Sequence, residues 1–289
     1  MAFSIDILDT ITDPGKAGRP NEDRFGFNPD AAFVLDGATG LGDRQFMEGH
    51  GSDAAWMAEF AASRLGARLD GVVDVAETVR AVSSEARDTF HAIAGEQPRY
   101  AWPSSSLTGL HRTPSGFEYF GLGDSCLYLL HDDGHGDFVI PIPGAYEWEQ
   151  LAAQKHIERT GGIGASGSAV GDPTTLEDLR KGRSRHNTTE SNVWTFGMVP
   201  EAADHLYRRP IEITGGATAI LCSDGLADLV ALYKIYDPAG LVRRAETEGL
   251  LPLVEELRRF ERDIDPDGLR FPRFKQSDDT TAILLRLKA

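Results

Sequence analysis

Ala31-Ala32-Phe33-Val34-Leu35 is a short apolar run that stops at Asp36-Gly37. A run of this length and composition is typical of a strand that is buried on both faces. A second apolar run, at 217–222, stops in the same way at Ser223-Asp224-Gly225. The two runs predict buried strands that each deliver a carboxylate at the strand end, which is a common geometry for an active site.

Helical and strand-like patterns alternate through the rest of the chain. Apolar residues at helical spacing predict helices at 52–69, 74–93, 226–233, 238–248 and 251–264. Strands are predicted at 3–12, 106–111, 116–121, 125–130 and 282–287, and the middle three form an antiparallel meander. Residues 145–192 follow neither period, which predicts an irregular flap-like insertion. Because no internal repeat or clean linker divides the sequence, we predict a single domain over residues 1–289.

The composition is that of an ordinary soluble protein with an acidic surface. Hydrophobic residues make up 41% of the 289 residues, and 29 basic against 45 acidic residues give a net charge of −16. Such a charge repels nucleic acid and anionic membranes, so neither is an expected partner. No basic segment leads into a long apolar stretch, and nowhere do eighteen apolar residues run together. We expect a cytoplasmic, unanchored protein.

Cysteine usage agrees with a reducing compartment. The chain has two cysteines, Cys126 and Cys222, and both are flanked by apolar residues in strand-like runs. This pattern favours reduced cysteines in the core over a disulfide framework or a zinc site.

Five aspartates fall at predicted strand ends or tight turns. They are Asp23, Asp36, Asp124, Asp224 and Asp278. Each one alone is explained by turn or capping chemistry, because Asp-Gly is a common turn. Carboxylates brought together would repel one another unless a multivalent cation neutralised them, and oxygen ligands alone favour Mg²⁺ or Mn²⁺. Two such ions about 3.5–4 Å apart can activate a shared water for phosphoryl hydrolysis.

The ordered set of motifs resembles the metal-dependent protein phosphatase family of the protein phosphatase 2C type. The matching segments are Arg19-Pro20-Asn21-Glu22-Asp23, Val34-Leu35-Asp36-Gly37-Ala38-Thr39-Gly40, Gly121-Leu122-Gly123-Asp124-Ser125, Leu221-Cys222-Ser223-Asp224-Gly225-Leu226 and Asp278-Asp279-Thr280-Thr281. They occur in the family's order over almost the whole chain. The resemblance implies an α+β fold, a four-layer α/β/β/α sandwich with two central antiparallel sheets, which agrees with the predicted helices and meander.

The resemblance also implies roles for the aspartates and a requirement for two or three Mg²⁺ or Mn²⁺ ions. Asp36 would bridge two metals, and Gly37 would offer its backbone carbonyl to one of them. Asp224 and Asp278 would complete the first site. Of the catalytic residues that it implies, Asp36 and Asp224 are thus also metal ligands.

The remaining implied roles concern the second and third ions and the phosphate. Asp23 would serve the second metal directly or through water, and Asp124 would help Asp224 to hold a weaker third ion. The family's phosphate-binding arginine falls on Gly18, so the neighbouring Arg19 is the candidate, with Arg44 as its substitute. Ala38 stands where many eukaryotic members have a histidine that acts as general acid, and bacterial-type members often lack it as well.

The expected function is therefore metal-dependent hydrolysis of phosphoserine and phosphothreonine on protein substrates. Two alternatives stay open: a catalytically silent relative that binds phosphoproteins or senses a partner, and a phosphatase for a small phosphorylated metabolite. Residues 145–192 are expected to determine the substrate, and their basic residues Lys181, Arg183 and Arg185 are candidates for contact with an acidic one.

Overall fold

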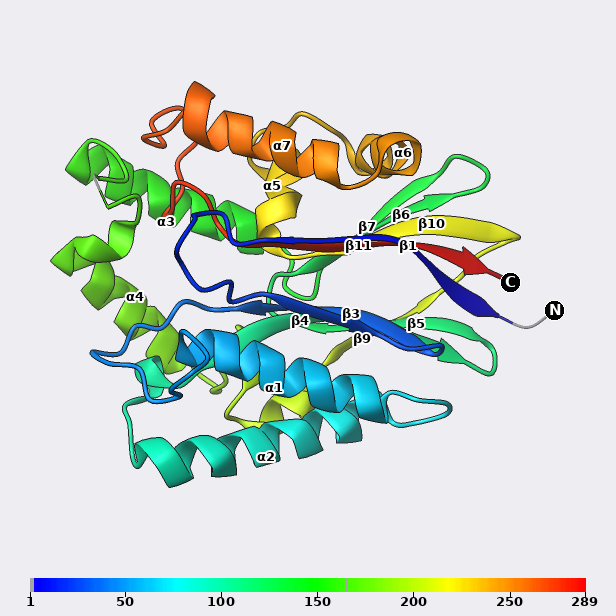
Figure 1. Ribbon diagram of the computed structural model, residues 1–289, viewed down its shortest axis with the longest axis horizontal. Helices are drawn as coiled ribbons and strands as arrows, with labels where there is room; N and C mark the ends of the chain where they lie inside the picture. Colours follow the sequence, from blue (N-terminus) through cyan, green and yellow to red (C-terminus); the bar gives the residue numbers. More distant parts are fainter. Residues whose placement is uncertain (1–2, 165) are drawn as a thin grey trace.

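Two antiparallel sheets lie face to face between two layers of helices in the computed structural model, which describes residues 3–164 and 166–289 (Figure 1). One sheet has the order β1-β11-β10-β6-β7, with the bounds Ser4–Asp13, Thr280–Lys288, Gly216–Cys222, Cys126–His131 and Gly136–Val139. The other has the order β2-β3-β4-β5-β9, with the bounds Arg24–Phe27, Ala31–Gly37, Ser104–Thr113, Gly116–Leu122 and Tyr207–Ile211. A short strand, β8 (Phe196–Gly197), pairs with the start of β4.

Helices cover the outer face of each sheet. The second sheet is covered by α1 (Asp53–Arg68) and α2 (Val75–Ala94). The first sheet is covered by α5 (Asp224–Ala231), α6 (Pro238–Glu248) and α7 (Leu251–Arg259), the last of which ends in a π-helical turn at Phe260–Ile264. Three short 3₁₀ turns lie at Arg99–Ala101, Ala169–Gly171 and Pro200–His205. This arrangement confirms the predicted four-layer α/β/β/α sandwich.

The position of strand β3 between a helix layer and the other sheet explains why residues 31–35 are all apolar. Phe33 and Leu35 pack under the helices α1 and α2, whereas Ala32 and Val34 point into the core between the two sheets. Since successive side chains in a strand point to opposite faces, a strand buried on both faces has few polar positions. Strand β10 follows the same rule, with Ile220 facing the helices of the other layer.

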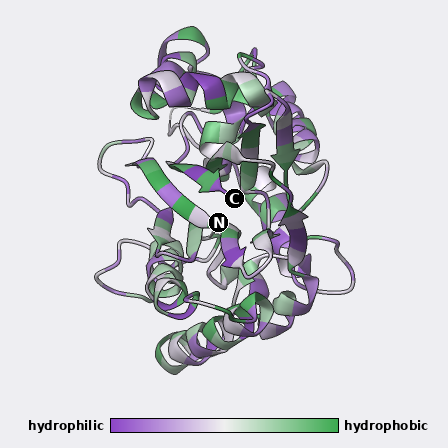
Figure 2. Cartoon of the chain, turned by 90° about the vertical axis from the view of Figure 1, so that its right-hand side faces the viewer, coloured by the Kyte–Doolittle hydropathy of each residue, from purple (hydrophilic) through white to green (hydrophobic). Residues whose placement is uncertain are grey.

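The two long helices begin close to where the sequence predicts them. The Ser52 hydroxyl accepts a hydrogen bond from the backbone N–H of Ala55 at 3.0 Å, and Asp74 caps α2 by accepting from Ala76 at 2.9 Å. These caps satisfy backbone donors that have no partner within the helix. Figure 2 shows that the helices carry both hydrophobic and hydrophilic stretches, as one buried face requires.

The prediction of an irregular insertion at 145–192 is wrong, because most of this segment is helical. It forms α3 (Ala145–Thr160) and α4 (Pro173–Arg185), which lie at the end of the sandwich away from the two termini (Figure 1). Only Thr175 of α4 is buried, and α3 buries no more than Ala153, His156 and Ile157, so neither helix has a long apolar stripe for a periodicity to detect. The readable signal was the cap of α4, where Asp172 precedes Pro173 at the first helical position. Ala165 lies outside the described residues.

The two cysteines and the length of the helices bear on the expected environment of the chain. Both cysteines are buried and free, and their Sγ atoms lie 3.7 Å apart across β6 and β10. Among residues 3–164 and 166–289, none of the helices combines the length and apolarity that crossing a bilayer requires.

Candidate functional site

Most of the predicted metal ligands line one cavity between the strand ends and the insertion helices. The cavity has a volume of about 380 Å³. Its wall includes Asp36, Gly37, Asp124, Asp224 and Asp278. These five positions are spread over more than 240 residues of sequence, so their meeting at one cavity is a consequence of the fold.

The strand pairing brings these carboxylates together. Asp36 is the next-to-last residue of β3 and pairs with Ser106 of β4. Asp224 begins α5 two residues after Cys222, and Cys222 pairs with Ala282. Because β10 and β11 are antiparallel, the end of β10 lies beside the start of β11, and Asp278 just precedes that start. The ends of strands in both sheets therefore meet at the same place.

Two glycines allow the segments that carry the acids to approach each other closely. A Cβ atom on Gly37 would lie 2.4 Å from the backbone oxygen of Glu22, and one on Gly225 would lie 2.3 Å from that of Asp279. Real Cβ contacts are essentially never so short. Each Asp-Gly pair is thus more than a turn, because its glycine lets a second acidic segment pack against the first.

Asp23 is the most deeply buried of the predicted ligands, although it does not line the cavity. It is 1% exposed, and neither carboxylate oxygen has a hydrogen-bond partner among the described residues. Burial and, less strongly, repulsion from Asp278 raise the pKa of Asp23 to about 7, although the nearby hydroxyls of Ser223 and Thr281 oppose the rise. An ionised carboxylate in this position needs a cation.

Burial and repulsion between carboxylates also raise the pKa values of Asp36 and Asp224. Loss of water contact raises the pKa of Asp36 well above its usual value, and repulsion from Asp23, Asp124 and Asp278 adds to the rise. Burial and repulsion from Asp36 and Asp278 do the same to Asp224. The carboxylates are therefore close enough to oppose one another's ionisation.

The donors nevertheless fit a hard divalent cation. Within the part of the chain that the structure describes, no three His, Cys, Asp or Glu side chains are gathered tightly enough to hold a metal ion without movement. The two unpartnered oxygens of Asp23 and the all-oxygen donor set match the preference of Mg²⁺ and Mn²⁺.

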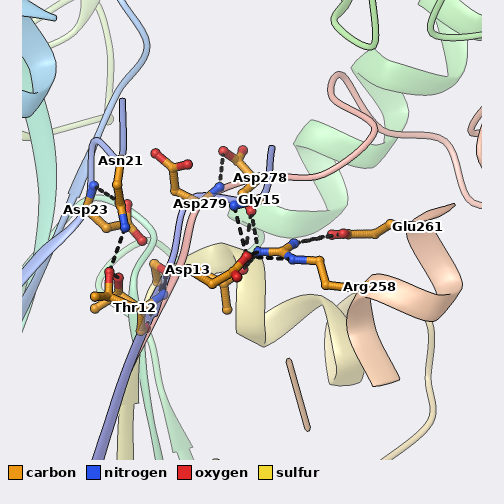
Figure 3. Close-up of polar contacts among 12 residues, drawn as sticks. Thr12, Asp13, Gly15, Asn21, Asp23, Arg258, Glu261, Asp278 and Asp279 are labelled. Atoms are coloured by element: carbon orange, nitrogen blue, oxygen red, sulfur yellow. Dashed lines mark hydrogen bonds and ion pairs between the residues drawn. The ribbon is translucent and has the colours of Figure 1, made fainter. Parts of the chain in front are cut away.

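The Glu22 carboxylate accepts hydrogen bonds from two hydroxyl groups, and its backbone N–H donates a third hydrogen bond. Its Oε1 accepts from Ser52 Oγ at 2.5 Å and its Oε2 from Thr39 Oγ1 at 2.7 Å. The backbone N–H of Glu22 donates to Asp279 Oδ2 at 2.6 Å, so the loop that carries Asp23 faces the Asp278–Asp279 turn (Figure 3). Glu22 thereby fixes the position of Asp23.

Three cations that the sequence analysis did not assign to the metal or phosphate site also line the cavity, namely Arg183, Arg273 and Lys275. Lys275 Nζ lies 2.6 Å from Asp278 Oδ1. Arg183 of α4 is partly exposed, but its Nη1 atom is buried and makes no hydrogen bond with any described residue. Burial raises the pKa of Asp124, and the guanidinium of Arg183 opposes that rise. The only sequence signal for Lys275 was its place three residues before Asp278.

The predicted phosphate-binding arginine lies elsewhere. Arg19 is exposed in the loop after β1, and Arg44 is exposed and stacks over the Phe46 ring at 4.5 Å. Neither residue lines the cavity. Arg19 stays a prediction.

Comparison with known proteins identifies the fold. No protein-family profile matches the amino-acid sequence, and no curated protein matches it. Among solved structures, the chain is similar to the PPM Ser-Thr phosphatase MsPP from Mycobacterium smegmatis, in complex with cacodylate, with a TM-score of 0.55 and 20% identity over 97% of this chain and 98% of that one. It is also similar to the Mycobacterium tuberculosis serine/threonine phosphatase PstP, with a TM-score of 0.54 and 18% identity over 99% and 100% of the two chains. A structure of the catalytic domain of PstP in complex with two manganese ions gives a TM-score of 0.53 at 17% identity. The chain thus has the fold of the bacterial PPM serine/threonine phosphatases over its whole length.

Proposed function

We propose that this protein hydrolyses phosphate monoesters with the help of divalent cations, and that its substrates are phosphoserine and phosphothreonine residues of proteins. The observation that carries the proposal is the convergence of Asp36, Asp124, Asp224 and Asp278 on one cavity, with the bare carboxylate of Asp23 beside it. The fold is one that similar chains use for this reaction.

In this proposal the acidic residues divide the work of holding the ions. Asp36, Asp224, Asp278 and the Gly37 carbonyl would hold the first ion, Asp36 and Asp23 would hold the second, and Asp124 with Asp224 would hold a weaker third. When bound, Mg²⁺ or Mn²⁺ supplies Lewis acidity and a water that is acidic enough to ionise near neutral pH. The protein's own contribution is to fix these oxygens at rigid strand ends and to orient the phosphate.

Arg183 is the residue that we assign to the phosphate, in preference to Arg19. Its buried, unpartnered Nη1 lies in the wall of the cavity that the carboxylates share. A guanidinium can donate two parallel hydrogen bonds to phosphate oxygens, which matches a donor that lacks a partner among the described residues.

Replacing Arg183 with Gln is expected to lower kcat/KM for p-nitrophenyl phosphate about 100-fold, because a charge-assisted phosphate contact is lost. Inhibition by inorganic phosphate should weaken in parallel. The matched control is Arg185→Gln on the same helix, since Arg185 is exposed and does not line the cavity. If Arg19→Gln showed the loss and Arg183→Gln did not, the phosphate would be bound at the N-terminal loop.

Trp148 offers a surface for the peptide part of a substrate. It lines the cavity and is still 54% exposed. Trp148→Ala should lower kcat/KM for a phosphopeptide about tenfold while changing that for p-nitrophenyl phosphate little, because only the peptide is large enough to pack on the ring. Leu151→Ala is the control, since Leu151 is 58% exposed one turn along α3 but does not line the cavity. Equal losses on both substrates would argue against a protein substrate.

The proposed function is tested by assaying the protein with Mn²⁺, with Mg²⁺ and with EDTA. We expect metal-dependent cleavage of p-nitrophenyl phosphate and of phosphoserine and phosphothreonine peptides. A panel of small phosphorylated metabolites run beside the peptides distinguishes a metabolite phosphatase, which would prefer one member of that panel. Absence of hydrolysis on every substrate with bound metal would refute the enzyme assignment.

One observation favours a second candidate, a catalytically silent phosphoprotein-binding relative. Asp278, an expected metal ligand, already forms an ion pair with Lys275. If that pair replaced the metal permanently, calorimetry would detect no Mn²⁺ binding, and a phosphopeptide would bind without being hydrolysed.

A further inference from the structure

Lys275 brings a positive charge of the protein itself into the carboxylate cluster. Its Nζ lies 2.6 Å from Asp278 Oδ1, and its side chain is 26% exposed. Burial lowers the pKa of Lys275, but Asp278 raises it above its usual value, and the carboxylates of Glu22 and Asp224 add to that rise. One oxygen that a divalent cation would need is therefore already engaged by a lysine.

The backbone around Lys275 is held in place by the insertion. Ala169 donates its N–H to the Phe274 carbonyl at 2.7 Å, and Gln276 donates its N–H to the Gly167 carbonyl at 3.0 Å. These bonds flank a bridge between Ser168 and Lys275. Because the backbone is held on both sides, the ammonium and the Asp278 carboxylate can separate by rotation of their side chains without movement of this segment.

We propose that Lys275 is an internal competitor for the divalent cation at Asp278. The inference rests on the proposed function, because it concerns the same site. The ammonium neutralises Asp278 in the metal-free protein, and it turns away when a divalent ion binds that oxygen. Two cations about 4 Å apart in a partly buried site repel one another strongly, so lysine and metal exclude each other there. Lys275 thus sets the concentration of metal at which the site fills.

The test compares Mn²⁺ binding to the wild-type protein and to Lys275→Met by isothermal titration calorimetry. Methionine keeps much of the length of the side chain and removes its charge, so we expect Mn²⁺ to bind at least about tenfold more tightly. Lys275→Arg retains a cation and should bind Mn²⁺ as weakly as the wild type. Lys16→Met is the matched control, because exposed Lys16 donates to the Ser166 carbonyl of the same insertion at 3.2 Å without contacting a carboxylate.

Thermal unfolding provides a second readout that does not depend on activity. In EDTA, Lys275→Met should melt below the wild type, because Asp278 loses its counter-ion. With Mn²⁺ the variant should gain more in melting temperature than the wild type does. Unchanged or weaker Mn²⁺ binding by Lys275→Met would overturn this inference and leave the proposed function standing. Failure of both proteins to bind Mn²⁺ would overturn the two together.

Discussion

Asp36→Asn is expected to lower the Mn²⁺-dependent hydrolysis of p-nitrophenyl phosphate by at least about 1000-fold. Asp36 lies at the centre of the cluster, since Asp23, Asp124 and Asp278 all repel its carboxylate. An amide is a neutral and weaker ligand, so the ions that this carboxylate shares would bind poorly. The measurement is kcat/KM over a range of Mn²⁺ concentrations, with Asp224→Asn assayed in parallel.

The same substitution should change stability in the opposite direction when metal is absent. Asn at position 36 removes one of the repelling charges, so the variant should melt above the wild type in EDTA. Mn²⁺ at 100 times its dissociation constant stabilises a protein that binds it by about 2.7 kcal/mol, and the variant should lose most of that gain. Asp88→Asn on α2 is the control, because that side chain is 70% exposed and forms only a surface ion pair with Arg87. Full activity in both Asp36→Asn and Asp224→Asn would show that these residues do not form the metal site of the hydrolase.

The elements that sequence predicts best are those whose burial leaves a clear pattern. Strands β3 and β10 pack against both a helix layer and the other sheet, so the runs 31–35 and 217–222 are apolar at every position except Thr218. Helix α2 buries one face only, and its apolar residues recur at helical spacing. In each case the pattern follows from contacts that the chain makes on folding.

Elements at the margins of the fold leave weaker patterns. Strands β2 and β9 are edge strands with partly exposed residues, and β9 contains Pro210, which cannot donate to a ladder. Helices α3 and α4 bury few side chains, so their sequences read as irregular. Sequence reasoning missed or misread these elements, as it missed the short strands β7 and β8.

The residues of the candidate site also fall into those that the sequence predicts and those that it does not. Four of the acids were predictable because Asp36, Asp124, Asp224 and Asp278 lie in or beside buried strands, and strand ends have a fixed place in a sandwich. Asp23 lies instead before the partly exposed edge strand β2. Lys275 was not predicted, and Arg183 was named only as a candidate contact for an acidic substrate, because both reach the cavity from segments without such a pattern, the helix α4 and the loop before β11. Only the tertiary packing of the insertion brings them to the carboxylates.

The position of Asp278 depends on a buried arginine at the end of α7. Arg258 has a side chain only 8% exposed, and it pairs with Glu261 at 2.8 Å and with Asp13 at 2.7 Å. It also donates to the Asp278 carbonyl at 2.8 Å and to Thr280 Oγ1 at 2.9 Å (Figure 3). One guanidinium thereby joins β1, α7 and the turn before β11.

Arg258→Met is expected to destabilise the fold by about 3–5 kcal/mol and to lower the melting temperature by roughly 10 °C, because Glu261 is left buried and ionised without its partner. Thermal and urea unfolding in EDTA measure the loss without interference from metal. Arg259→Met is the matched control, since its side chain is exposed and next in sequence. The double variant Arg258→Met with Glu261→Gln should recover part of the stability, because the unpaired charge is then removed as well. If Arg258→Met unfolded within about 1 kcal/mol of the Arg259→Met control, the Asp278 turn would be held by its strand pairing alone.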